Sequence, residues 1–427
     1  MVVTYFFYNL AMCLYGLGVC IASLFSKKVR KMVRGERIAT RYIKERWDED
    51  APYLWFHAAS LGEFEQGRPM MEWIRQKYPQ YKILLTFFSP SGYEVRKDYE
   101  GADIICYLPL DTPYRSLHFF SATKNIVAAF FIKYDFWWNY LHILKAHNVP
   151  TYSISSTFRP GQIFFRSYAK RYARVLKCFT HLYVQNERSR ELLAGIGVTN
   201  VTVVGDTRFD RVLKIKEDAM SLPIVESFCE DESKKTIVVG SSWPGDENVI
   251  FPCPCKMIIA PHNVTEDRIN NIISKCEGKS VMRYTQTDAQ HDAEKLREAD
   301  VLIIDCYGLL SSVYRYGDVT YVGGGFDHTG IHNVLEAAVW EKPVLYGPNY
   351  HKYQEGEELI ASGGGIELSD ADNFREVMKT LLNDKSLLAD ISAKAGAYVK
   401  SKTGATAQIL NDIDNLLASS VDKRINK

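Results

Sequence analysis

Residues 53–63 read YLWFHAASLGE, a run of apolar, strand-forming residues that passes through small residues into the start of a helical pattern. Glu63 falls in the first turn of that helix. The same strand-and-helix unit recurs further along the chain. Further candidate strands begin at Lys82, Asn125, Pro150 and His181, and helical stretches such as residues 64–78 lie between them. This alternation predicts a parallel sheet with helices on both faces.

A second series of strands follows a less regular, charge-rich stretch at residues 206–235. Its candidate strands begin at Thr236, Lys256, Ala299, Asp318 and Lys342. We therefore expect two Rossmann-like α/β domains, with ligands at the carboxyl ends of the strands. The expected parts are a membrane anchor (1–26), a basic juxtamembrane linker (27–46), a first Rossmann-like domain (47–207), a connection (208–235), a second Rossmann-like domain (236–404) and a C-terminal helix and tail (405–427).

The bulk composition narrows the function classes. A chain of 427 residues with 46% hydrophobic and 24% charged residues is ordinary for a globular protein of two or three domains. Its formal net charge of +1 argues against a nucleic-acid-binding protein, so any basic function must be local.

The N-terminus has the pattern of a membrane anchor. Residues 2–25 contain no charged side chain, and this run is longer than the ~20 residues that a helix needs to cross the hydrocarbon. The basic residues that follow indicate a cytoplasmic flank; they are Lys27, Lys28, Arg30, Lys31, Arg34 and Arg37. A cleaved signal peptide would carry its basic region first. Whether the helix spans the membrane or lies flat on it stays open.

In the first half of the chain, the candidate catalytic and binding residues lie in two turns between strand and helix. Glu63 is placed to deprotonate a hydroxyl, or simply to complement the dipole of the helix it begins. Ser60 precedes it and allows close approach of a sugar. Ser89, Ser91 and Gly92 form a second turn, which either binds a sugar or phosphate or is an ordinary loop with an N-cap.

Residues 158–177 interleave basic and aromatic side chains. Arg159, Arg166 and Lys170 are among the basic ones. Such a stretch suits an anionic membrane surface or the phosphates of a lipid. No RNA-binding signature accompanies it, and a solvated helix face is the remaining alternative.

The most specific run in the second half is residues 318–348, DVTYVGGGFDHTGIHNVLEAAVWEKPVLYGP. A strand ends in three glycines, and a helix is expected to begin near Ile331 or His332. Backbone amides of the glycine loop can reach a phosphate, and the helix N-terminus favours its charge. Glu336 can accept hydrogen bonds from ribose hydroxyls. A purely structural turn is the alternative.

Several of these motifs resemble the family of 3-deoxy-D-manno-octulosonic acid (Kdo) transferases, from about residue 47 to 410. The carriers are HAASLGE (57–63), TFFSPSGYE (86–94), FIKYDFWWN (131–139) and the glycine-rich run. The resemblance implies a GT-B fold, with two Rossmann-like domains facing a cleft behind an N-terminal membrane-anchor helix. It implies an inverting transfer of Kdo from CMP-Kdo to a lipid A precursor in lipopolysaccharide biosynthesis. The expected location is the inner membrane, with the catalytic domains on its cytoplasmic face and an anionic lipid surface as partner.

Resemblance also assigns roles. Glu63 matches the base, and Asp135 is the second residue expected to be catalytic. Lys133 stands where the family usually has an acidic residue, so either Asp135 supplies the acid, or Lys133 shifts the charge balance, or activity is altered. The residues expected to bind the acceptor are Ser60, Ser89, Ser91, Gly92, Arg159, Arg166, Lys170 and Arg208. Those expected to bind the donor are Ser241, Ser242, Pro261, His262, Gly323, Gly324, Gly325, Phe326, His332, Asn333 and Glu336.

Two features complete the expectation. His262 occupies a place where the family more often has arginine, and it replaces a permanent charge with a ring that is mostly neutral at pH 7. No acidic cluster resembles a metal-binding motif, so we expect neither a metal nor another cofactor. The rival functions are a GT-B transferase that uses a UDP-sugar on a lipid-linked acceptor, and a non-catalytic CMP-binding membrane protein.

Overall fold

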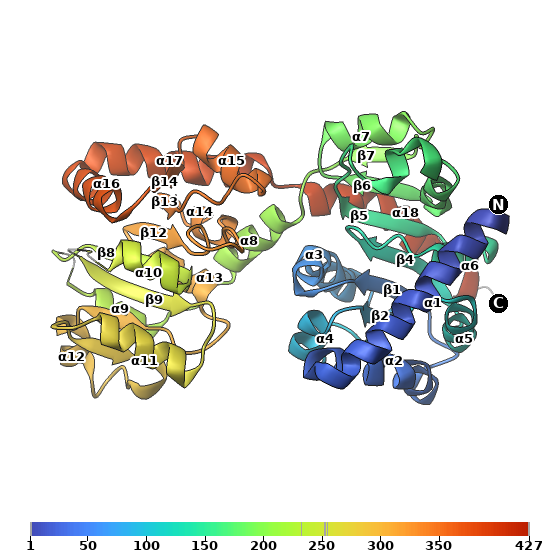
Figure 1. The fold of residues 1–427 in the computed structure, drawn as a ribbon, viewed down its shortest axis with the longest axis horizontal. Coiled ribbons are helices and arrows are strands. Elements are labelled where there is room, and N and C mark those ends of the chain that lie inside the picture. The colour runs from blue at the N-terminus through green and yellow to red at the C-terminus, as the bar shows by residue number, and fades with distance from the viewer. Residues whose placement is uncertain (1, 232, 252, 254, 426–427) are drawn as a thin grey trace. The chain divides into compact units, whose positions relative to one another are not determined.

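The computed structural model describes residues 2–231, 233–251, 253 and 255–425 (Figure 1). The chain divides into two compact units. Unit 1 comprises Met1–Arg211 and Gly404–Lys427, and unit 2 comprises Val212–Thr403. Each unit is described by itself below.

Unit 1 is built on a parallel seven-stranded sheet of order β3-β2-β1-β4-β5-β6-β7. The strands are β1 (Tyr53–Ala58), β2 (Lys82–Phe87), β3 (Ile104–Tyr107), β4 (Ile126–Ile132), β5 (Thr151–Ser156), β6 (His181–Val184) and β7 (Val201–Val203). The helices are α1 (Val2–Phe25), α2 (Lys27–Arg46), α3 (Leu61–Lys77), α4 (Pro90–Arg96), α5 (Pro113–Ala122), α6 (Trp138–Ala146), α7 (Glu187–Ala194), α8 (Arg208–Glu217, divided between the units) and α18 (Ala405–Ile425).

The central strands of unit 1 are buried on both faces. Every residue of β1 is buried, as expected for a parallel strand covered by helices on each side. The C-terminal helix α18 returns to this unit. The Tyr81 hydroxyl donates to the Leu417 carbonyl at 2.6 Å, and Ile409 and Ile413 join the core on the α3 side of the sheet. Helices α1 and α18 therefore both belong to unit 1.

Unit 2 repeats the plan with a parallel seven-stranded sheet of order β10-β11-β9-β8-β12-β13-β14. Its strands are β8 (Thr236–Ser242), β9 (Lys256–Pro261), β10 (Val281–Arg283), β11 (Val301–Ile303), β12 (Val319–Val322), β13 (Val344–Tyr346) and β14 (Gly365–Glu367). Its helices are α9 (Pro223–Cys229), α10 (Pro244–Ile250), α11 (Glu266–Lys275), α12 (Ala293–Glu298), α13 (Leu310–Val313), α14 (Leu335–Ala338), α15 (Gln354–Ala361), α16 (Ala371–Asn383) and α17 (Lys385–Ser401).

Each sheet has a central point where the strand order reverses beside its first strand. In unit 1 the chain proceeds outward from β1 to β2 and β3, and then returns to place β4 on the other side of β1. In unit 2 the corresponding neighbours are β8 and β12. The crevice at the carboxyl ends of such a strand pair is where open α/β sheets bind ligands.

The predicted α/β class with two parallel sheets is confirmed, and two local predictions are wrong. The helix expected from Ile331 or His332 begins at Leu335 and is only one turn long. The stretch 206–235, expected to be irregular, contains α8 and α9. Residues 158–177 contain three 3-10 helices, η1 (Ile163–Phe165), η2 (Ser167–Ala169) and η3 (Tyr172–Cys178). The segment 247–256 holds the end of α10, and its residues 252 and 254 lie outside the described residues.

Among the described residues, one helix is long and apolar enough to cross a membrane. It covers Val3–Phe25. Length and composition alone are weak evidence for membrane association.

Candidate active site

Glu63 lies beside the strand reversal of unit 1. β1 ends at Ala58, and α3 begins three residues later at Leu61, with Ser60 as its N-cap. The Ser60 hydroxyl donates a hydrogen bond to the Glu63 carboxylate, which is partly exposed. Glu63 thus has the first-turn position that both sequence interpretations require. Its carboxylate is held by a neighbouring hydroxyl at a ligand-binding edge of the sheet.

Asp135 follows β4, the strand next to β1, and is oriented by a histidine. The fully buried His57 contacts an Asp135 carboxylate oxygen through Nε2 at 2.8 Å and the Thr86 hydroxyl through Nδ1 at 2.9 Å. The Trp137 indole N–H also lies 3.2 Å from His57 Nε2. His57 was overlooked in the sequence, although it begins the HAASLGE run. The structure therefore brings both predicted catalytic carboxylates to neighbouring strand ends.

Lys133 directly follows β4 and lies in the left-handed region, with φ of 62°. Its carbonyl accepts a hydrogen bond from the Ser156 hydroxyl at 2.7 Å, which fixes this turn. Burial raises the pKa of Asp206, but the positive charges of Arg208 and Lys133 outweigh it and hold that pKa below its usual value. The charge of Lys133 thus acts on Asp206.

Arg208, expected to bind the acceptor, forms an ion pair with Asp206 at 2.7 Å. The Gln66 side chain donates to the other oxygen of the same carboxylate at 3.0 Å. A guanidinium in such a pair is fixed in position, and about a quarter of its side chain remains exposed. Arg208 is therefore a positioned cation near the carboxyl edge of the unit 1 sheet.

The turn before α4 packs against the turn that carries Ser60. Ser89 caps α4 by accepting from the Ser91 amide at 3.3 Å, as in the ordinary N-cap interpretation. A Cβ at Gly92 would meet the Phe87 ring at 2.3 Å and the Ser60 backbone at 3.1 Å. Glycine is needed here because the two predicted acceptor loops touch, so the structure brings Ser60 and Gly92 together.

Arg159, Arg166 and Lys170 are exposed on the segment that follows β5. Of the aromatic residues between them, Phe164 is buried against Phe136, with their rings 5.3 Å apart, whereas Tyr168 is 81% exposed. The segment therefore presents basic side chains together with an exposed tyrosine.

In unit 2, a buried carboxylate organises the glycine loop after β12. Asp246 is fully buried and accepts hydrogen bonds from the Gly324 amide at 2.8 Å, the Trp243 amide at 2.9 Å and the Tyr321 hydroxyl at 2.7 Å. The Phe326 amide lies 3.4 Å from Oδ1, the carboxylate oxygen that also accepts from Tyr321, whereas the Gly324 and Trp243 amides bond to Oδ2. Asp246 was not singled out from the sequence, although its place three residues after Trp243 is that of a capping-box carboxylate.

These contacts correct one part of the expected phosphate site. The Gly324 and Phe326 amides bond to Asp246, and the Gly323 amide bonds to the Gly240 carbonyl at 2.8 Å, so these three donors serve the loop itself. A Cβ at Gly325 would meet the Gly347 backbone at 2.4 Å. The glycines are thus required by close backbone packing. The one-turn α14 also removes the expected helix N-terminus near His332.

Trp243, His262 and His332 form a stack beside the glycine loop. The ring centroids of Trp243 and His262 are 4.7 Å apart, and those of the two histidines 4.4 Å. The Trp243 indole donates to His332 Nε2 at 2.9 Å. Burial, with the His262 charge second, lowers the pKa of His332 to about 4, and burial also lowers the pKa of His262. Both rings are therefore neutral at pH 7, and they offer a flat surface suited to a nucleobase or sugar.

Asn333 and Glu336 lie together after the loop. The Asn333 amide donates to Glu336 at 2.9 Å, and the Ser311 hydroxyl donates to the other carboxylate oxygen at 2.6 Å. The carboxylate that the sequence assigns to ribose hydroxyls is thus held in a defined orientation.

Ser241, Ser242 and Pro261 lie at the ends of β8 and β9. Ser241 has φ of 52°, and Ser242 pairs with Pro261 across the two strands. The Ser242 hydroxyl donates to Glu247 at 3.0 Å.

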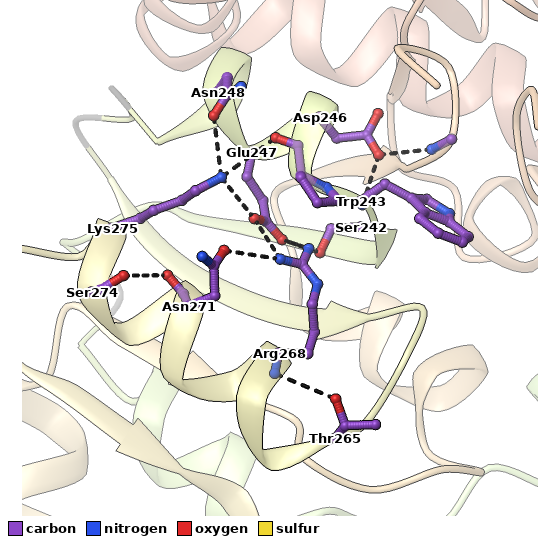
Figure 2. Close-up of polar contacts among 12 residues, drawn as sticks. Ser242, Trp243, Asp246, Glu247, Asn248, Thr265, Arg268, Asn271, Ser274 and Lys275 are labelled. Carbon is purple, nitrogen blue, oxygen red and sulfur yellow. Dashed lines mark hydrogen bonds and ion pairs between the residues drawn. The ribbon is translucent and has the colours of Figure 1, made fainter. Parts of the chain in front are cut away.

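Figure 2 shows that Glu247 joins β8 and α10 to α11. Glu247 is fully buried, accepts from both terminal nitrogens of Arg268 and lies 3.2 Å from the Lys275 ammonium. A buried carboxylate is tolerated only when it is paired in this way. The ion-pair cluster thereby fixes the strand end that carries Ser242. This cluster was overlooked in the sequence because its members are far apart in the chain.

Within the part of the chain that the structure describes, no three or more His, Cys, Asp and Glu side chains gather as a metal-ligand set. Metal independence remains a prediction.

Two parallel α/β sheets, each with candidate residues at its strand reversal, define a protein of the GT-B class. Solved structures show the same fold: UDP-GlcNAc 2-epimerase from Neisseria meningitidis aligns with a TM-score of 0.56 and 14% identity over 85% of this chain and 100% of that one. MurG from Acinetobacter baumannii aligns with a TM-score of 0.52 and 12% identity over 86% of this chain and 99% of that one.

Sequence comparison gives the family. Residues 35–211 match the model of the 3-deoxy-D-manno-octulosonic-acid transferase family (kdotransferase). The Kdo transferase of Aquifex aeolicus is 24% identical over 78% of this chain and 86% of its own length. That of Rickettsia bellii is 23% identical over 89% of this chain and 90% of its own. Over most of its length, the chain is therefore similar to Kdo transferases, a family of glycosyltransferases.

Proposed function

We propose that this chain transfers Kdo from CMP-Kdo to a lipid A precursor, with inversion at the anomeric carbon. The observation that carries the proposal is Glu63, which lies at the strand reversal of unit 1, held by Ser60, within the region that matches the family model. A partly exposed carboxylate at a ligand-binding sheet edge is suited to general-base catalysis.

In the proposed reaction, Glu63 takes the proton from an acceptor hydroxyl. The hydroxyl oxygen forms a bond to the anomeric carbon of Kdo. The bond from that carbon to the phosphate oxygen breaks, and CMP leaves with the electron pair. Asp135, oriented by His57, supplies a second fixed carboxylate near the acceptor. Direct displacement of this kind inverts the anomeric configuration.

The donor side of the proposal rests on unit 2. The neutral stack of Trp243, His262 and His332 offers a face for the cytosine ring, and Glu336 is oriented to accept from ribose hydroxyls. Basic groups take over the charge of the departing phosphate in the absence of a metal.

The acceptor side rests on exposed cations in unit 1. Arg159, Arg166 and Lys170 are suited to lipid phosphates, since Arg and Lys bind phosphate through charge-assisted hydrogen bonds. With the N-terminal apolar helix, they support a location on the cytoplasmic face of the inner membrane.

The test is turnover of CMP-Kdo with a lipid A precursor by the full chain and by Glu63→Gln. Loss of a general base reduces the rate by about 10²–10⁴-fold. Glu72→Gln is the matched control, since Glu72 is on the same helix and only pairs with Arg68 at the surface. Full turnover in Glu63→Gln, with CMP affinity unchanged, would refute the assignment of the base.

A UDP-sugar donor is the second candidate. It is favoured by His262, which stands where the resemblance leads us to expect arginine, and by the Neisseria epimerase of the same fold, whose structure was solved bound to UDP-GlcNAc. Thermal protection distinguishes the two: a CMP-Kdo enzyme is stabilised by CMP and much less by UDP. A non-catalytic CMP-binding protein would be protected by CMP but would show no turnover.

A further inference from the structure

Helix α1 presents one continuous stripe toward unit 1 and a different face outward. Its partly buried positions recur with helical spacing; they are Thr4, Tyr8, Asn9, Met12, Gly16, Val19, Cys20 and Ser23. The outward residues include Phe6, Phe7, Leu14 and Leu17, each about 60% exposed. The stripe therefore collects most of the polar side chains of the helix, and the large apolar side chains face away.

Polar side chains of this stripe form hydrogen bonds with the rest of unit 1. The Tyr8 hydroxyl donates to the buried Asp111 carboxylate at 2.6 Å, and the Asn139 amide donates to the Asn9 side-chain oxygen at 2.9 Å. The same Asp111 carboxylate accepts from the Asn139 backbone amide at 2.9 Å, so the contacts of Tyr8 and Asn9 belong to one hydrogen-bonded cluster. Further along, a Cβ at Gly16 would meet Leu110 at 2.8 Å. Figure 1 shows α1 running across unit 1.

These contacts are incompatible with a spanning helix. At ~1.5 Å per residue, Asn9 lies about 24 Å along the axis from Phe25. In a helix that entered the bilayer at its C-terminal end, Tyr8 and Asn9 would lie near the far side of the ~30 Å hydrocarbon layer. Asp111 and Asn139 belong to the sheet-containing part of unit 1, which cannot follow them there.

Basic groups accompany both ends of α1. At the C-terminal end, Lys27 and Lys28 are exposed, and the Arg30 guanidinium donates to the Leu24 carbonyl at 2.7 Å. Toward the N-terminal end, Tyr8 stacks on Tyr172, with ring centroids 5.9 Å apart. Tyr172 belongs to the segment that exposes Arg166, Lys170, Arg171 and Arg174. An apolar face flanked by cations matches an anionic lipid leaflet.

The apolar surface continues into a cavity under the N-terminal part of α1. Its volume is about 560 Å³, and it is lined by Tyr5, Leu117, Trp138 and Ile143 among others. Tyr5 and Leu117 are also exposed, so the cavity lining is continuous with the outward face of the helix.

We propose that α1 is an in-plane membrane helix. Its outward face inserts into one leaflet of an anionic bilayer, while Tyr8 and Asn9 stay docked on unit 1 and both ends of the helix remain on the same side of the membrane. This inference is independent of the donor and acceptor chemistry.

Cross-linking in membranes tests the docking. The full chain carries Cys13→Ser and Cys20→Ser as a background, and the cysteine pair is introduced as Asn9→Cys and Asn139→Cys. This variant is bound to vesicles of phosphatidylethanolamine and phosphatidylglycerol and treated with a short bis-maleimide. We expect an intramolecular cross-link. The control pair replaces Asn9→Cys with Leu10→Cys, which points outward, and we expect much less product. If neither cysteine pair gave a cross-linked product, the proposal that Asn9 stays docked on unit 1 would be refuted.

Topology labelling tests the same proposal without altering the docking residues. Val3→Cys, in the same background, is exposed to a membrane-impermeant maleimide in intact cells and after the inner membrane is opened. The proposal predicts labelling only after opening, because the N-terminus stays cytoplasmic. Labelling in cells whose outer membrane alone is permeable would establish a spanning helix and overturn the proposal. Failure of the full chain to float with the anionic vesicles would overturn its membrane part.

Discussion

Asp246 offers a quantitative test of how the glycine loop of unit 2 is held. Asp246→Asn keeps the side-chain shape but converts one acceptor oxygen into a donor. The best orientation places the new NH₂ group toward Tyr321, whose hydroxyl can turn to accept. The Phe326 amide then has no acceptor. The hydrogen bonds from the Trp243 and Gly324 amides remain, but they are weaker because their acceptor is no longer charged.

The magnitude follows from these bonds. A hydrogen bond to a charged group contributes about 1.5–3 kcal/mol and a neutral one about 0.5–1.5 kcal/mol, so the two weakened bonds and the one lost bond cost roughly 3 kcal/mol. Burial raises the pKa of Asp246, and relief of this desolvation offsets part of the loss. We expect a net destabilisation of about 2–3 kcal/mol. Asp246→Ala leaves several buried donors without an acceptor, each costing about 1–3 kcal/mol, and should cost more.

Calorimetry of the full chain in detergent measures the effect, because Asp246 lies in unit 2 alone. For a unit of this size, 1 kcal/mol shifts Tm by about 2–4 °C, so Asp246→Asn should lower the unit 2 transition by roughly 5–10 °C and leave the unit 1 transition in place. CMP affinity should fall with it. Asp267→Asn, an exposed carboxylate on α11, is the control. If both Asp246 variants unfold within 1–2 °C of the wild type, the reasoning is refuted.

Three further predictions concern unit 2. Glu247→Gln leaves Arg268 and Lys275 facing a neutral group and should destabilise the unit by about 3 kcal/mol in urea unfolding, whereas Lys275→Gln, at the more exposed side of the cluster, should cost less than about 1 kcal/mol. Gly324→Ala should cost at least about 1–3 kcal/mol and reduce CMP affinity in calorimetric titration, because φ is 93° and its Cβ would meet the Gly330 carbonyl at 2.2 Å. His332 has a folded pKa of about 4, below its unfolded value, so its contribution to stability is present above pH 6.5 and is lost as the pH falls toward 4. His332→Gln keeps an acceptor for the Trp243 indole but cannot be protonated in this pH range. Between pH 7 and 5, its free energy of unfolding should therefore fall less than that of the wild type, and the difference is at most about 2 kcal/mol before solvent screening. Equal falls in the two proteins would contradict this prediction.

The inner strands of the two sheets could be predicted from the sequence, whereas the edge strands could not. All ten strands expected from the sequence are present, and the four that were overlooked, β3, β7, β10 and β14, are the outer strands of the two sheets. Central strands of a parallel sheet are buried on both faces and therefore appear as long apolar runs. The outer strands are only three or four residues long, and β7 and β10 are only partly buried, so their hydrophobic signal is weak.

The helix near His332 shows tertiary contacts overriding a local pattern. The run GIHNVLEAA has helical spacing from Ile331 onward. In the structure, the Ile331 amide bonds to the Asn349 carbonyl and the His332 amide to the Gly323 carbonyl, so both residues are used in loop contacts. The helix can begin only after these contacts are made.

The candidate site could be located from the sequence, but its supporting residues could not. Glu63 and the glycine loop were found because strand–turn–helix patterns mark the carboxyl edges of the sheets. His57 pairs with Asp135, and Asp246 with Gly324, across 78 residues in each case. No local pattern reports a contact of that separation, because it is created by the order of strands in the sheet.

The most direct test of the account is CMP release from CMP-Kdo by the purified full chain in detergent, with and without a lipid A precursor. The account predicts release that depends on the acceptor, and it then makes Lys133 a tolerated replacement for the acidic residue usual in the family. No release by a folded protein that binds CMP, in the presence of the acceptor, would contradict the transferase assignment.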